Sequence, residues 1–122
     1  MHNINVSNSV VGTINTGSIG VVDQSISALI QSNEPDLARA AKELTEAIIG
    51  SNDLTSNQKK ELLETLSIVA TEAVAPKAQR RAVVAKTLIE RAMEVSSLAN
   101  DITDVCQKWW PVLLLAFGTA GA

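Results

Sequence analysis

The chain has 122 residues and a formal net charge of −3, with 46% hydrophobic and 19% charged residues. This length corresponds to one domain, which can bury a hydrophobic core without help from metals or disulfides. The mildly acidic balance argues against a nucleic-acid partner, because binding to a phosphate backbone requires a basic surface. Aromatic residues make up only 2% of the chain, which excludes the stacking platforms of single-stranded nucleic-acid binders.

The residue types that build common catalytic and metal sites stand alone in this sequence. His2 is the only histidine and Cys106 is the only cysteine. A metal site needs several clustered ligands, and a catalytic thiol needs an activating base. Gly12 and Gly17 have the spacing of a phosphate-binding loop, but Ser18 stands where that loop has its lysine. We therefore expect no enzyme activity, no cofactor and no metal, and we expect Cys106 to be a buried or half-buried apolar residue.

The first 22 residues contain no charged side chain. Apolar residues recur at even positions from 4 to 14, and this period of two is typical of a β-strand with one apolar face. Residues 15–18 predict a turn, after which an extended apolar stretch is expected to resume. The missing Lys and Arg also argue against a secretory signal, so we expect a cytoplasmic protein. The predicted self-association residues of this β segment are Ile4, Val6, Val10, Ile14, Ile19 and Val21.

The predicted β segment has two alternative partners. Two short strands alone are marginally stable in water, so they must pair with another element. The segment has none of the lysines, prolines or inward charges that usually protect a strand edge. Its Asn side chains could stack in register between chains, and its Val and Ile side chains could form a dry interface. The other alternative is a β-hairpin that lies on the apolar surface of the chain's own helical body.

Helical periodicity follows the β segment. Asp23 is the expected N-cap of a first helix, and Pro35 fits the first turn of a second helix. Thr55 and Gln58 form a capping-box pair, T-x-x-Q, which opens a third helix. Pro76 is expected to end that helix or to begin the next one.

A long fourth helical pattern contains apolar residues spaced by seven, as in the seam of a coiled coil. The dipeptide at positions 100–101, Asn-Asp, is a candidate break that would divide the pattern into two helices. The predicted seam residues are Leu88, Val95, Ile102 and Trp109.

The basic residues that open this pattern form the chain's only basic concentration. A solvated start of a helix is the favoured interpretation, because no aromatic residues interleave with them. The alternative is a contact to phosphate or anionic lipid. These residues are Lys77, Arg80, Arg81 and Lys86.

The last 14 residues form an uncharged tail that begins with two tryptophans. The tail is shorter than the ~20 residues that a helix needs to span a bilayer. Burial in the protein or in an oligomer interface is favoured over lipid contact, although tryptophans beside Lys108 also suit a membrane interface. Pro111 is expected to kink or to start a helix. The candidate membrane or interface residues are Trp110, Leu113, Leu114 and Phe117.

The layout resembles that of small bacterial proteins of defence and conflict systems. In those proteins an Asn/Gly/Ser-rich β-prone segment, here residues 3–17, precedes a helical body with an apolar Trp-Pro tail, here residues 110–118. Such segments resemble bacterial amyloid-signalling motifs, which recruit an effector by templated β-assembly. The resemblance is one of layout and composition, and it implies no catalytic residue.

The sequence therefore predicts a mainly α protein, a bundle of three to five helices preceded by a short β segment, either a hairpin or a β-arc. Residues 1–22 are the predicted assembly segment, residues 23–108 the helical bundle and residues 109–122 the apolar tail. The predicted function is non-enzymatic self-association, or recruitment of a protein partner with a similar β segment, in bacterial defence signalling. The alternative is a pore-forming or membrane-disrupting effector that uses the tail.

Overall fold

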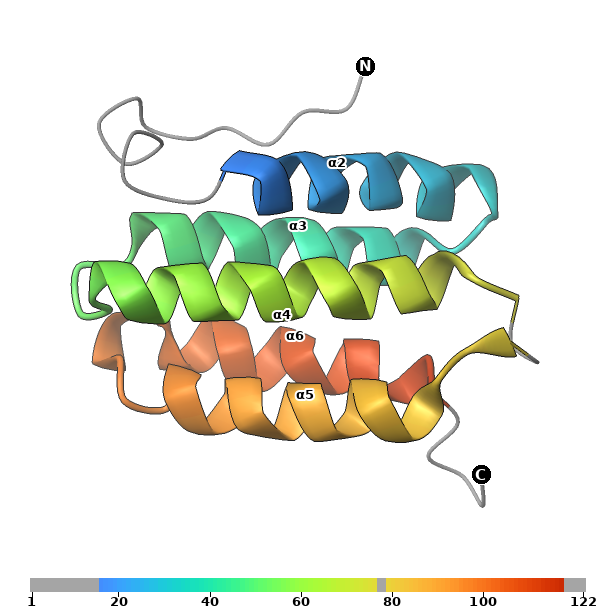
Figure 1. The fold of residues 1–122 in the computed structure, drawn as a ribbon. Helices are drawn as coiled ribbons and strands as arrows, with labels where there is room; N and C mark the ends of the chain where they lie inside the picture. The colour runs from blue at the N-terminus through green and yellow to red at the C-terminus, as the bar shows by residue number, and fades with distance from the viewer. Residues whose placement is uncertain (1–15, 77–78, 118–122) are drawn as a thin grey trace.

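The computed structural model describes residues 16–76 and 79–117, which form five α-helices and one short 3-10 helix. The helices lie in three layers (Figure 1). Helix α2 (Thr16–Gln31) covers the pair formed by α3 (Pro35–Gly50) and α4 (Ser56–Val74). The pair formed by α5 (Ala82–Ser96) and α6 (Thr103–Leu115) packs against the other side of this middle layer. The prediction of a mainly helical bundle is confirmed.

Helix α2 runs across residue 22, where the predicted β segment was expected to end. Residues 16–22 are helical, so the predicted turn and the extended stretch after it are wrong from Thr16 onward. Asp23 lies inside α2 and does not cap it. Val22, Ile26 and Leu29 are all fully buried, and their spacing of four and three places them on one face of a helix. Burial of this face in the bundle outweighs the local β-preference of valine and isoleucine.

The structure confirms the predicted helix ends in the connections between α2 and α3 and between α3 and α4, and at the end of α4. Asn33 has a φ of 63°, a left-handed conformation that asparagine tolerates, and Pro35 follows in the first turn of α3. At the start of α4, Gln58 N donates to Thr55 Oγ1 over 3.1 Å, and Thr55 N donates to Gln58 Oε1 over 2.9 Å. Helix α4 ends two residues before Pro76. Local capping chemistry therefore determines where these helices begin and end.

The fourth helical pattern forms two antiparallel helices (Figure 1). Helix α5 ends at Ser96, the 3-10 helix η2 (Asn100–Ile102) follows, and α6 then runs back beside α5. A continuous coiled-coil seam is therefore wrong, and the alternative break at residues 100–101 is confirmed. Pro111 lies inside α6 and does not start it.

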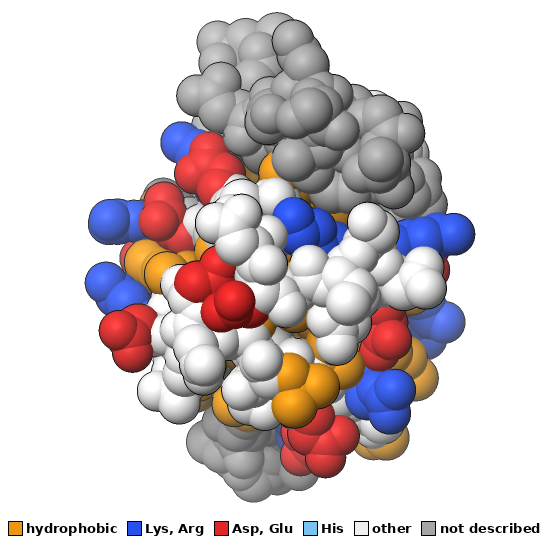
Figure 2. All heavy atoms as spheres, turned by 90° about the vertical axis from the view of Figure 1, so that its left-hand side faces the viewer, with side chains coloured by type: hydrophobic (Ala, Val, Ile, Leu, Met, Phe, Trp, Pro, Cys, Tyr) orange, Lys and Arg blue, Asp and Glu red, His pale blue; other side chains and the backbone are white. Residues whose placement is uncertain are grey.

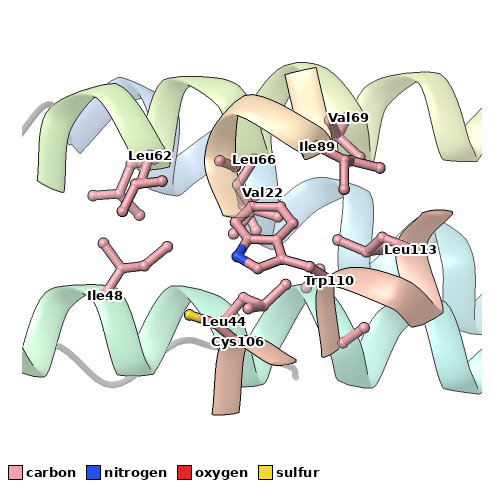
Figure 3. Close-up of a cluster of buried hydrophobic side chains, with 14 of the residues drawn as sticks. Val22, Leu44, Ile48, Leu62, Leu66, Val69, Ile89, Cys106, Trp110 and Leu113 are labelled. Carbon is pink, nitrogen blue, oxygen red and sulfur yellow. The ribbon is translucent and has the colours of Figure 1, made fainter. Parts of the chain in front are cut away.

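The core draws buried side chains from all five α-helices, as Figure 3 shows around the indole of Trp110. Trp110 is fully buried, although aromatic residues are scarce in this chain. Cys106 is buried beside it, as expected. The side chains labelled in Figure 3 are Val22 of α2, Leu44 and Ile48 of α3, Leu62, Leu66 and Val69 of α4, Ile89 of α5, and Cys106, Trp110 and Leu113 of α6.

Candidate functional site

The predicted self-association residues divide between two parts of the chain. Ile19 and Val21 lie in the first two turns of α2, where Ile19 packs partly buried against the core. Val21 is 41% exposed and points away from the core. The other four residues of the set lie outside the described residues: Ile4, Val6, Val10 and Ile14.

Val21 borders a shallow surface hollow of about 270 Å³ between α2 and α4. Ile68 of α4 borders the same hollow and is 42% exposed. Ser67 and Thr71 also border the hollow, as do Glu72 and Arg81, which pair with each other. Ile68 is not among the residues predicted from the sequence, because whether its side chain faces the core or the surface depends on how α4 packs.

The predicted seam residues pack inside the subunit. Val95 and Ile102 are buried, and Leu88 and Trp109 are partly buried against the same core. The guanidinium of Arg39 lies 5.4 Å from the Trp109 ring centroid, within the range of a cation–π contact. These residues pack α5, η2 and α6 against the core of the same chain. They therefore do not form an exposed apolar face along one continuous helix.

Most of the predicted tail residues complete the core. Trp110 and Leu113 are fully buried, Phe117 is 3% exposed, and Leu114 is partly buried. Leu115, in contrast, is 67% exposed. The structure shows burial within the protein for these residues, which is one of the two favoured interpretations of the tail. The described helices include none that combines the length and the apolarity required to cross a membrane.

The basic cluster contains one buried structural residue, Arg80, which corrects the prediction of a solvated helix start. The side chain of Arg80 is only 6% exposed. Its guanidinium donates to the carbonyl oxygens of Ala73 at 2.7 Å, Ala75 at 2.9 Å and Ala116 at 2.7 Å, and it lies 3.4 Å from a carboxylate oxygen of Glu34. Arg80 therefore joins the ends of α4 and α6 to the start of α3, because these carbonyls have no partner within their helices.

Arg81, the next residue, pairs with Glu72 of α4. Its side chain donates to Glu72 Oε2 from Nε at 2.8 Å and from Nη2 at 2.6 Å, and its backbone N–H donates to Glu72 Oε1 at 2.9 Å. These hydrogen bonds stabilise the carboxylate and lower the pKa of Glu72. The pair fixes the connection between α4 and α5.

At the opposite end of the bundle, the loop after α3 is joined to the loop before α6. Asp101 accepts hydrogen bonds from Ser51 Oγ at 2.8 Å and from Asn52 N at 2.7 Å. Asp53 Oδ2 accepts a bond from the Asp101 backbone N–H at 3.0 Å. The backbone N–H of Asn52 contributes most to lowering the pKa of Asp101. Figure 2 looks onto this end and shows acidic, basic and uncharged side chains intermixed, so it presents no single-sign patch.

The described part of the chain contains no group of three or more His, Cys, Asp or Glu side chains able to hold a metal ion. The geometry gives two ends at which side-chain hydrogen bonds join the loops, a buried apolar core, and a hollow between α2 and α4 that the Glu72–Arg81 pair borders. Comparisons with protein-family models, with curated proteins and with solved structures found no match.

Proposed function

We propose that this protein is a non-enzymatic self-associating protein, in which a helical bundle carries an N-terminal β-prone segment that pairs between chains. The observation that carries this proposal is the direct junction between an uncharged segment and a helix held in the core. Residues 1–15 have no charged side chain, and α2 follows at Thr16 with Val22 fully buried.

In this proposal the helical bundle forms the folded core and the segment before α2 forms the contact between chains. The described helices support this, because they bury their own core. The apolar tail closes that core through Trp110, Leu113 and Phe117. The segment before α2 retains apolar side chains at alternate positions and none of the usual edge protection. An uncharged segment that contains Val and Ile and precedes a folded helical bundle is suited to strand pairing with a second copy or with a protein partner that has a similar segment. Recruitment of an effector in bacterial defence signalling would use the same pairing.

The membrane-active alternative is less favoured. Trp110 and Leu113 are fully buried and Phe117 is 3% exposed, so the tail would have to leave the core before these side chains could enter a bilayer. Fully burying one large apolar side chain contributes roughly 1.5–3 kcal/mol. Release of all three would therefore cost most of the free energy that stabilises a domain of this size.

The test is sedimentation velocity on the full chain and on the double variant Val10→Lys/Ile14→Lys. Two charges on the apolar face of the segment should prevent close pairing of strands. We expect the wild-type chain to sediment as a species larger than 12.9 kDa and the variant to sediment as a monomer. The helical circular dichroism signal should be unchanged, because both substitutions precede α2.

The matched control is Val83→Lys/Val84→Lys, which places the same two charges on α5, where the valines are 79% and 44% exposed. This variant should assemble like the wild type. A wild-type chain that stays monomeric at high concentration contradicts the proposal. If assembly persists in Val10→Lys/Ile14→Lys and is lost in the control, the contact between chains lies on the helical bundle and not on the N-terminal segment.

A further inference from the structure

The α5–α6 hairpin contains a recess of about 210 Å³ that the self-association proposal does not use. It lies between the last turn of α5 and the first turns of α6. Even an apolar cavity of about 150 Å³ is large enough to hold a benzene-sized ring. The lining residues are Met93, Ser96, Ser97, Thr103, Cys106, Gln107 and Trp110.

The inner wall of this recess, the α5–α6 recess, is buried and largely apolar. Trp110 is fully buried, Cys106 is 4% exposed and Ser96 is 1% exposed. Burial raises the pKa of the Cys106 thiol, so the thiol remains protonated at neutral pH. None of the lining side chains is then ionised. A charged ligand would lose its hydration without gaining a counter-charge, so the recess favours a neutral molecule.

The hydroxyls of Ser97 and Thr103 favour a ligand that donates a hydrogen bond. The indole Nε1–H of Trp110 already donates to Ser96 Oγ at 3.2 Å. The hydroxyls of Ser97 and Thr103 donate to the carbonyl oxygens of Glu94 at 2.6 Å and Ala99 at 2.8 Å. Their protons are therefore engaged, whereas each hydroxyl oxygen keeps the capacity to accept. A few oriented polar groups on an apolar wall are typical of small-molecule sites.

We propose that the α5–α6 recess binds a small neutral aromatic molecule that carries one N–H or O–H donor, of the size of phenol or indole. The ring packs against Met93, close to the buried indole of Trp110, and the donor is accepted by a hydroxyl oxygen at the rim. Binding joins α5 to α6 and stabilises the folded bundle, because a ligand that binds only the native state raises its stability.

The experiment is a titration of the full chain with phenol and with indole, followed by the Trp110 Nε1–H resonance in ¹H–¹⁵N spectra. The Trp109→Phe variant assigns this resonance, because it leaves Trp110 as the only tryptophan. We expect a saturable shift with a dissociation constant between about 10 μM and a few mM, as the small number of ligand atoms allows. Benzoate, which is charged, should produce a much smaller shift.

A pair of matched variants locates the site. Ser97→Phe places a ring at the mouth of the recess, whereas Thr87→Phe places the same ring on an exposed part of α5. Both native hydroxyls donate to a carbonyl of their own helix, so the loss of that hydrogen bond is matched. Ser97→Phe should reduce the affinity at least tenfold, and Thr87→Phe should leave it unchanged.

Two results would overturn this proposal. One is a Trp110 resonance that does not move with either probe at several mM. The other is an equal loss or equal retention of binding in the two phenylalanine variants. If Ser97→Phe fails to fold, Cys106→Ala provides the second measurement, because it enlarges the recess and should keep or increase the affinity. Each outcome is independent of the self-association test, which changes only residues 10 and 14.

Discussion

Arg80 Nη1 donates a hydrogen bond to the carbonyl oxygen of Ala116 at 2.7 Å, and this contact joins the end of α6 to the connection between α4 and α5. The same guanidinium also donates to Ala73 and Ala75 of the α4 end. The planar guanidinium group of an arginine has five N–H donors, so it can donate to carbonyl oxygens in several directions at once. The helix ends at this side of the bundle therefore depend on one buried side chain.

Replacement of Arg80 by lysine should lower the free energy of unfolding by roughly 2–4 kcal/mol. Lysine keeps the positive charge but cannot reach the same set of carbonyls, so buried acceptors lose their partners. The control is Arg91→Lys, whose native side chain is 63% exposed and 3.3 Å from Glu61; its effect should stay within about 0.5 kcal/mol. Urea denaturation followed by circular dichroism measures both values. Equal effects of the two variants would contradict the structural role of Arg80.

Acid should destabilise the bundle through Asp101 and Glu72. Both carboxyls have lowered pKa values in the folded state, so the unfolded chain binds protons more readily. Their contribution to stability is complete above the ordinary pKa values, 3.8 for Asp101 and 4.5 for Glu72, and is lost as the pH falls below them. Thermal unfolding between pH 7 and pH 2.5 measures this loss.

Neutral variants should reduce that acid sensitivity. Asp101→Asn and Glu72→Gln should each lower the melting temperature at pH 7 and make it depend less on pH, because the group that takes up the proton is removed. Glu90→Gln, at an exposed position of α5, is the control and should follow the wild-type pH profile. If all three variants keep the wild-type pH dependence, other groups cause the acid unfolding.

Phe117→Ala should destabilise the protein by roughly 3–5 kcal/mol, because it leaves a cavity at a residue that is 3% exposed. Leu115→Ala, at a residue that is 67% exposed, should change the free energy of unfolding by about 0.5 kcal/mol or less. Liposome leakage measured with the same two variants also tests the membrane alternative. Leakage that depends on Leu115 and not on Phe117 would show that the tail acts without leaving the core.

Thr55→Ala should remove about 1 kcal/mol of stability, within the range of 0.5–2 kcal/mol measured for helix N-caps. The hydroxyl accepts the Gln58 N–H, and the reciprocal bond from Gln58 is weakened when the cap is lost. Ser56→Ala, one residue further along and exposed, is the matched control and should be nearly neutral. A Ser56 effect as large as that of Thr55 would mean that α4 begins at a different residue.

The sequence by itself determined the helical class and the ends of the helices that depend on local chemistry. Pro35, the Thr55–Gln58 pair and Pro76 act on the backbone within one turn, so their effects can be read from neighbouring residues. The same holds for the break near residues 100–101. The prediction of a β segment in residues 1–15 stays a prediction, since those residues lie outside the described part of the chain.

Only the tertiary structure decided which side of each pattern faces the core. Residues 15–18 suit a turn and the apolar residues after them suit an extended stretch, but residues 16–22 are helical and Val22 is buried where α2 packs on α3 and α4. Arg80 and Arg81 are adjacent and chemically identical, yet one side chain is 6% exposed and the other 67%. Sequence periodicity reports the average environment of a helix face, whereas the burial of a single residue depends on the helices that pack against it, and these come from distant parts of the chain.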